Sequence, residues 1–160
     1  MRDAWELASF VVTALGLPFA IVFFWWEQRK ERNNEEEEAY QLLSDAYNDF
    51  LRVVLANSDL RLRTHEPLAD PTPEQNERML VIYDMLISLF ERAYIVAWSS
   101  SMSDVERRRW NSWDDFMREW CRRESFRSAL PLLLRGEDPQ FQAYILSIAD
   151  EERGSIAGWQ

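Results

Sequence analysis

The sequence has little of several residue types on which catalytic sites and crosslinked folds depend. Its 160 residues contain one cysteine (Cys121), one histidine (His65) and four isolated glycines. A single cysteine excludes an internal disulfide framework and a cluster of thiolate metal ligands. One histidine cannot supply the several imidazoles of a zinc or di-iron site, and isolated glycines do not make a phosphate-binding loop. We therefore expect no metal, no other cofactor and no enzymatic activity.

Basic residues are also scarce relative to acidic ones. The chain has 18 Lys and Arg against 28 Asp and Glu, which gives a net charge of −10. The charges within residues 1–32 cancel, so the acidic excess lies entirely in residues 33–160. Sequence-independent binding to nucleic acid needs a basic surface. We therefore do not expect nucleic acid to be a partner.

What the sequence does contain is one long uncharged run, residues 7–26. As a helix this run would be about 30 Å long, which matches the hydrocarbon core of a bilayer. Trp5 stands at one end of the run, and Trp25 and Trp26 stand at the other. Indole rings prefer the headgroup level, so these tryptophans would mark both membrane interfaces. We predict that residues 1–32 form a transmembrane anchor with its flanks.

The basic residues around this run indicate its orientation. Arg29, Lys30 and Arg32 follow the run, whereas Arg2 alone precedes it. The positive-inside rule then places the carboxyl side in the cytoplasm and the amino terminus outside. A cleaved signal peptide would have a shorter apolar region and a small-residue cleavage site. The sequence therefore favours a retained anchor in the inner membrane of a bacterium.

Small and polar residues form one stripe along this predicted helix. Ser9, Thr13, Gly16 and Ala20 fall within an arc of roughly 60°, and Glu27 continues the line just beyond the membrane. Small residues four apart let two helices approach closely, and hydroxyl groups can form hydrogen bonds between helices. The stripe is therefore a candidate self-association face or the lining of a narrow pore. A third interpretation is that any apolar run of this length contains some small residues.

The rest of the chain has the periodicity of helices, and no segment alternates in the way of a strand. Thr72–Gln75 and Ser103–Glu106 have the pattern of capping boxes, and Asp138 precedes a proline, as at a helix start. We predict an all-α protein with one N-terminal transmembrane helix followed by a cytoplasmic bundle of four to five helices. The bundle would cover residues 33–153, and residues 154–160 would form a frayed, flexible tail.

Apolar side chains recur at helical spacing in three of these segments. We expect the following residues to face the core: Leu43, Tyr47, Phe50, Leu51, Val54, Trp110, Trp113, Met117, Trp120, Phe141, Tyr144, Ile145 and Ile148.

The helix expected over residues 73–98 is apolar almost all round. Asp84, Ser88, Glu91 and Arg92 nevertheless lie on one face near its middle. Each central charge would cost roughly 2.5–3.5 kcal/mol in a bilayer. We therefore predict a buried helix of the bundle rather than a second membrane span.

Two groups of charged residues have no assigned role. Six arginines lie in or just after the helix that begins near Ser103: Arg107, Arg108, Arg109, Arg118, Arg122 and Arg123. They form a candidate surface for anionic lipid headgroups, RNA or an acidic partner, or they pair with acidic residues of the same helix. The run Glu35–Glu38 is a solvated face or, in a closed ring of subunits, a set of stacked acidic rings that favours cations.

Several segments resemble those of a widespread group of small bacterial membrane proteins without a characterised function: Glu38–Tyr40, Tyr47–Leu51, Leu89–Tyr94, Trp110–Trp113, Glu124–Arg127 and Asp138–Tyr144. The resemblance implies one amino-terminal span and a helical cytoplasmic domain. In layout alone, the chain is also similar to small membrane accessory proteins of RNA-guided defence systems, some of which form oligomeric pores.

These patterns predict a non-enzymatic, single-pass membrane protein that acts through self-association. In this interpretation the lipid bilayer and further copies of the chain are its partners, and the assembly acts as a homo-oligomeric pore or membrane effector. The alternative is an accessory or adaptor subunit anchored beside a larger membrane complex.

Overall fold

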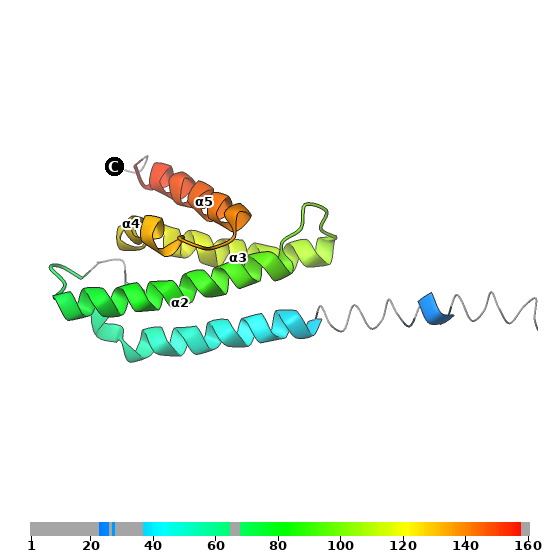
Figure 1. Cartoon of the computed structure of the whole chain (residues 1–160), viewed down its shortest axis with the longest axis horizontal. Helices are drawn as coiled ribbons and strands as arrows, with labels where there is room; N and C mark the ends of the chain where they lie inside the picture. The colour runs from blue at the N-terminus through cyan, green and yellow to red at the C-terminus, as the bar shows by residue number, and fades with distance from the viewer. Residues whose placement is uncertain (1–22, 26, 28–36, 65–67, 158–160) are drawn as a thin grey trace, which may run out of the picture. The chain divides into compact units, whose positions relative to one another are not determined.

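The computed structural model describes residues 23–25, 27, 37–64 and 68–157 (Figure 1). The chain divides into two compact units, residues 1–39 and residues 40–160. All regular elements in the described ranges are helical, which confirms the all-α prediction. Within those ranges, no helix combines the length and the apolar character that a membrane span requires.

Most residues of the predicted anchor lie outside the described ranges. These are Trp5, Ser9, Thr13, Gly16, Ala20, Trp26, Arg29, Lys30 and Arg32. Trp25 and Glu27 are described, and both are helical and exposed. The span, its association stripe and its orientation therefore stay predictions.

The unit formed by residues 40–160 is a helical bundle. Residues 37–56 are helical, and they are followed by the short helix η1 (Ser58–Leu60), α2 (Pro73–Ala97), α3 (Asp104–Cys121), α4 (Glu124–Leu133) and α5 (Pro139–Ala157). Helix 37–56 and α2 run in opposite directions side by side (Figure 1). The helices α2 and α3 contact each other, and each also contacts α4 and α5.

Both predicted capping boxes are present and set the starts of α2 and α3. The Thr72 hydroxyl accepts a hydrogen bond from the Gln75 amide at 3.2 Å, and the Gln75 side chain accepts one from the Thr72 amide at 3.0 Å. Ser103 and Glu106 form the same reciprocal pair. Because these bonds satisfy amides that have no partner within the helix, each box fixes a helix start locally.

Aromatic side chains dominate the core. The Tyr47 ring stacks on Phe116 at 4.3 Å between centroids, and the Phe50 ring meets Trp120 edge-on at 5.6 Å. The predicted core residues are buried, except that Leu51 and Tyr144 are half-buried. Each large aromatic ring removes 150–250 Å² from water on burial, so these contacts supply much of the driving force for packing.

The last two helices differ from the prediction in detail. The sequence suggests that Pro131 breaks or precedes a helix, whereas the structure places it inside α4. Pro131 is exposed and lies near the end of the helix, where the loss of one backbone hydrogen bond interrupts little of the helix. The segment predicted to fray after Arg153 is helical as far as Ala157. Gly136, at a φ of 93°, forms the turn between α4 and α5 in a conformation that favours glycine.

Candidate functional site: a pocket, two arginine groups and an exposed helix face

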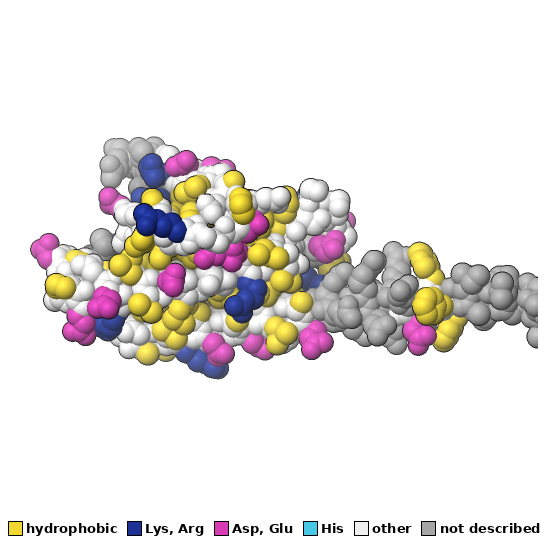
Figure 2. All heavy atoms as spheres, viewed as in Figure 1, with side chains coloured by type: hydrophobic (Ala, Val, Ile, Leu, Met, Phe, Trp, Pro, Cys, Tyr) yellow, Lys and Arg dark blue, Asp and Glu magenta, His cyan; other side chains and the backbone are white. Residues whose placement is uncertain are grey.

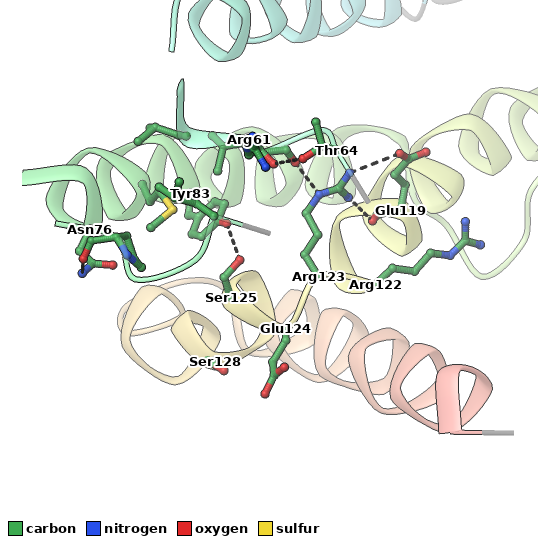
Figure 3. A pocket seen from close by; sticks show the side chains of 15 residues that line it. Arg61, Thr64, Asn76, Tyr83, Glu119, Arg122, Arg123, Glu124, Ser125 and Ser128 are labelled. Atoms are coloured by element: carbon green, nitrogen blue, oxygen red, sulfur yellow. Dashed lines mark hydrogen bonds and ion pairs between the residues drawn. The ribbon is translucent and has the colours of Figure 1, made fainter. Parts of the chain in front are cut away.

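A pocket of about 630 Å³ opens beside the junction of α3 and α4 (Figure 3). Its apolar lining comes from the chain around η1 and from α2: Leu60, Leu62, Leu68, Pro71, Met79 and Tyr83. Its polar lining comes mainly from α3 and α4 and their junction: Glu119, Arg122, Arg123, Glu124, Ser125 and Ser128. The volume suits a small ligand. No pattern in the sequence predicts this pocket, because its walls are far apart along the chain.

Arg123 is the central polar residue of this pocket, and it is held by the protein itself. Its Nε donates to the carbonyl oxygen of Leu62, and its Nη1 donates to that of Glu119 at 2.6 Å. Its guanidinium also lies 4.9 Å from the centre of the Trp120 ring. Burial is the main cause that lowers the pKa of Arg123. Arg123 therefore fastens the loop after η1 to α3.

On the opposite wall of the pocket, a hydrogen bond between side chains joins two helices. The Tyr83 hydroxyl and the Ser125 hydroxyl lie 2.8 Å apart in a hydrogen bond between α2 and α4. Burial raises the pKa of Tyr83, so its phenol stays protonated at neutral pH. Figure 3 shows both this bond and the contacts of Arg123 spanning the pocket walls. These polar groups serve to connect helices.

Arg118 and Arg122 form a second group, which links α3 to α5. Arg118 contacts Asp114 at 2.7 Å and Glu151 at 2.6 Å, and Arg122 contacts Glu152 at 3.0 Å. Hydrogen bonds to Asp114 and Glu151 raise the pKa of Arg118. The sequence predicts pairing within the helix, and the Asp114 contact is of that kind. The contacts to α5 were not foreseen, because their partners lie 30 or more residues away.

The remaining arginines of the predicted surface lie near the start of α3. Arg107 donates to the carbonyl oxygen of Met102, and Arg108 donates to that of Asp104. The Arg109 guanidinium lies 5.4 Å from the centre of the Tyr40 ring. At 1.5 Å per residue, Arg107 is about 16 Å along the helix from Arg118. Apart from Arg123 in the pocket, the arginines therefore form two groups, Arg118 with Arg122 and Arg107 with Arg108 and Arg109, and a shared surface for lipid or a partner stays a prediction.

Cys121 is fully buried in the core. Burial raises the pKa of its thiol to about 12, so the thiolate that nucleophilic chemistry requires does not form at neutral pH. In the described part of the chain, no cluster of His, Cys, Asp and Glu is arranged to hold a metal ion. The buried thiol therefore acts as a small apolar group in the core.

A small acidic cluster lies between α2 and the turn before α5. A hydrogen bond with Glu91 is the main cause that raises the pKa of Glu137 to about 7, with burial and the charges of Glu91 and Asp84 adding to it. Glu91 also accepts a hydrogen bond from the Asp138 amide. One carboxyl group of this cluster thus holds a proton near neutral pH. The charge of Glu91 within an apolar helix was the sequence signal for it.

The helix α2 is a helix of the bundle, as predicted, and it is buried on one side only. Val81, Met85, Ile95 and Val96 are 43–60% exposed. Figure 2 shows hydrophobic side chains across the face over which α2 runs in Figure 1. These apolar residues lie in two groups, Val81 with Met85 and Ile95 with Val96, and the exposed Ser88 and Arg92 lie between the groups. Apolar groups that share one helix face are a candidate surface for binding a partner.

The exposed face of α2 is therefore the strongest candidate for function among the described residues. Arg118, Arg123 and the Tyr83–Ser125 pair already have contacts within the chain, and the apolar side chains on the outward face of α2 are exposed to solvent. No protein-family model, curated protein or solved structure matches this chain.

Proposed function

We propose that this is a non-enzymatic, single-pass membrane protein that acts by associating with further copies of itself. The observation that carries the proposal is the exposure of Val81, Met85, Ile95 and Val96 on the outward face of α2. Water around such a face is released when a partner covers it, which favours association.

The amino-terminal sequence supports a membrane location for this association. Residues 7–26 carry no charge, and tryptophans stand at both ends of the run. Confinement to a membrane raises the local concentration of copies, so a weak contact between bundles suffices for assembly. The stripe Ser9, Thr13, Gly16 and Ala20 would add a second contact within the membrane. A pore or another membrane effector is the form of activity that such an assembly supports.

Native mass spectrometry of the full chain, released gently from membranes, tests this proposal. We expect a single closed assembly of identical subunits, and we expect Gly16→Leu to reduce its subunit number. Conductance measured across a bilayer containing the assembly then separates a pore from another effector. A monomer would refute the proposal. A fixed-ratio complex with a different chain would also refute it and would favour an accessory subunit.

A further inference from the structure

The exposed face of α2 is complementary to itself, because the residues at equal distances before and after Ser88 match each other. Asp84 lies four residues before Ser88 and Arg92 lies four residues after it, and the two carry opposite charges. Val81 lies seven residues before Ser88 and Ile95 lies seven residues after it, and both are β-branched apolar residues. All five residues are exposed. At 100° per residue they fall within an arc of roughly 80°, so they form one stripe.

We propose that two copies of the protein pair through α2, with the helices antiparallel and a twofold axis at Ser88. In this arrangement the Asp84 carboxylate of each copy faces the Arg92 guanidinium of the other. Each Val81 faces the other copy's Ile95, and the two Ser88 side chains meet at the axis. A twofold axis of this kind uses the same surface on both copies, which is how most homodimers associate.

The charges of Asp84 and Arg92 indicate that the partner is a second copy of the chain and that the two α2 helices are antiparallel. A parallel pair would place Asp84 beside Asp84 and Arg92 beside Arg92, which is repulsive. An antiparallel pair converts both repulsions into attractions. A different protein would need to reproduce the same spacing in reverse, whereas a second copy of this chain has it by construction.

The residues on and beside the stripe suit close packing of two helices. Serine at the axis is small, so the helix axes can approach to about 8 Å. Met85 and Val96 are exposed along one edge of the stripe and extend its apolar area. The opposite side of α2, which includes Leu86 and Phe90, is buried in the core of its own bundle. Pairing therefore covers the exposed side without disturbing the fold.

This inference rests on the proposed function, because it names the surface through which self-association occurs. Cysteine crosslinking of the full chain in membrane vesicles tests it. The native Cys121 is buried and its thiol pKa is about 12, so an introduced cysteine supplies the reactive thiol. Under mild oxidation, we expect Ser88→Cys to form a disulfide-linked dimer. Ser147→Cys, at an exposed position on α5, is the matched control and should remain a monomer.

Two further cysteine variants report the direction of pairing. In an antiparallel pair, each copy of Val81 lies roughly 20 Å from its counterpart, and so does each copy of Ile95. Val81→Cys and Ile95→Cys should therefore fail to crosslink alone, and an equal mixture of the two should form a disulfide-linked dimer. Self-crosslinking by each variant would show parallel helices and overturn the proposal.

Charge reversal tests the ion pairs in the Ser88→Cys background. Asp84→Arg places like charges opposite each other twice in the dimer, and Arg92→Asp does the same. We expect each single change to lower the crosslinked fraction at least fivefold. The double change Asp84→Arg with Arg92→Asp restores both pairs with their signs exchanged, so crosslinking should recover. A double variant as weak as either single variant would overturn the proposal.

The failure of this inference can be separated from the failure of the proposed function. If native mass spectrometry finds an assembly of identical subunits and Ser88→Cys does not crosslink, self-association stands and the α2 pair is wrong. If the full chain is a monomer and Ser88→Cys does not crosslink, both are wrong. Oligomers together with the predicted crosslinks support both.

Discussion

The helices α2 and α3 use their outward-facing residues in opposite ways. The arginines of α3 contact acidic side chains, backbone carbonyls and aromatic rings of the same chain. The outward face of α2 instead presents apolar side chains to solvent on both sides of a serine. A charged surface can thus be internally satisfied, whereas an apolar surface is satisfied only by a partner. The outward face of α2 is therefore a better candidate for binding a partner than the arginines of α3, although the arginines are the more noticeable feature of the sequence.

Among the substitutions that compare α2 with α3, the largest change in the free energy of unfolding should come from the buried side of α3. Trp120 is fully buried, meets Phe50 edge-on and donates a hydrogen bond to the Tyr47 hydroxyl. Trp120→Ala should lower the free energy of unfolding by about 3–5 kcal/mol, because it leaves a large cavity. Urea denaturation of the full chain in detergent, followed by fluorescence, measures this change. Leu55→Ala, at a highly exposed position, is the control and should change it by less than about 0.5 kcal/mol.

The contacts from α3 to α5 should have the next largest effect. Arg118 faces Glu151 and Glu152, and the Glu152 side chain is only 10% exposed. Arg118→Met should lower the free energy of unfolding by roughly 1–3 kcal/mol, since it leaves Glu152 nearly buried with one cation fewer. The same denaturation experiment measures the loss. Arg107→Met should cost less than about 0.5 kcal/mol if the two arginine groups differ as the structure indicates. Equal losses would contradict that distinction.

Local signals predicted much of this fold, and contacts between distant residues set the limit. The starts of α2 and α3 were predicted because each capping box lies within four residues. The contact of Arg118 with Glu151 was missed because nothing in either segment identifies the other. On α2, the polar residues Asp84, Ser88 and Arg92 share one face in the sequence, and this is the face that the structure leaves exposed. The pocket beside Arg123 depends on three separate segments and left no pattern in the sequence.

The acidic cluster between α2 and the turn before α5 should make stability depend on pH. The pKa of Glu137 is raised from 4.5 to about 7, so folding favours its protonated form. Its contribution to stability is therefore complete below pH 4.5 and is lost as the pH rises through 7. With allowance for solvent screening, the loss should be roughly 1–2 kcal/mol. Glu137→Gln should remove this dependence in urea denaturation at pH 5 and pH 8, whereas Glu77→Gln, an exposed change on α2, should keep it.

The smallest change in the free energy of unfolding should come from the exposed face of α2, where substitutions should affect association between copies instead. Val81→Ser and Ile95→Ser remove apolar groups that the monomer leaves in contact with water. Each should change the free energy of unfolding, measured in detergent that keeps the chain monomeric, by less than about 0.5 kcal/mol. Each should nevertheless weaken association of the full chain in membranes, because the lost groups are buried only between copies. Sedimentation or native mass spectrometry measures that loss. A substitution that destabilises the monomer as strongly as it weakens association would place these side chains in the bundle's own core. One that changes neither would remove α2 from the interface.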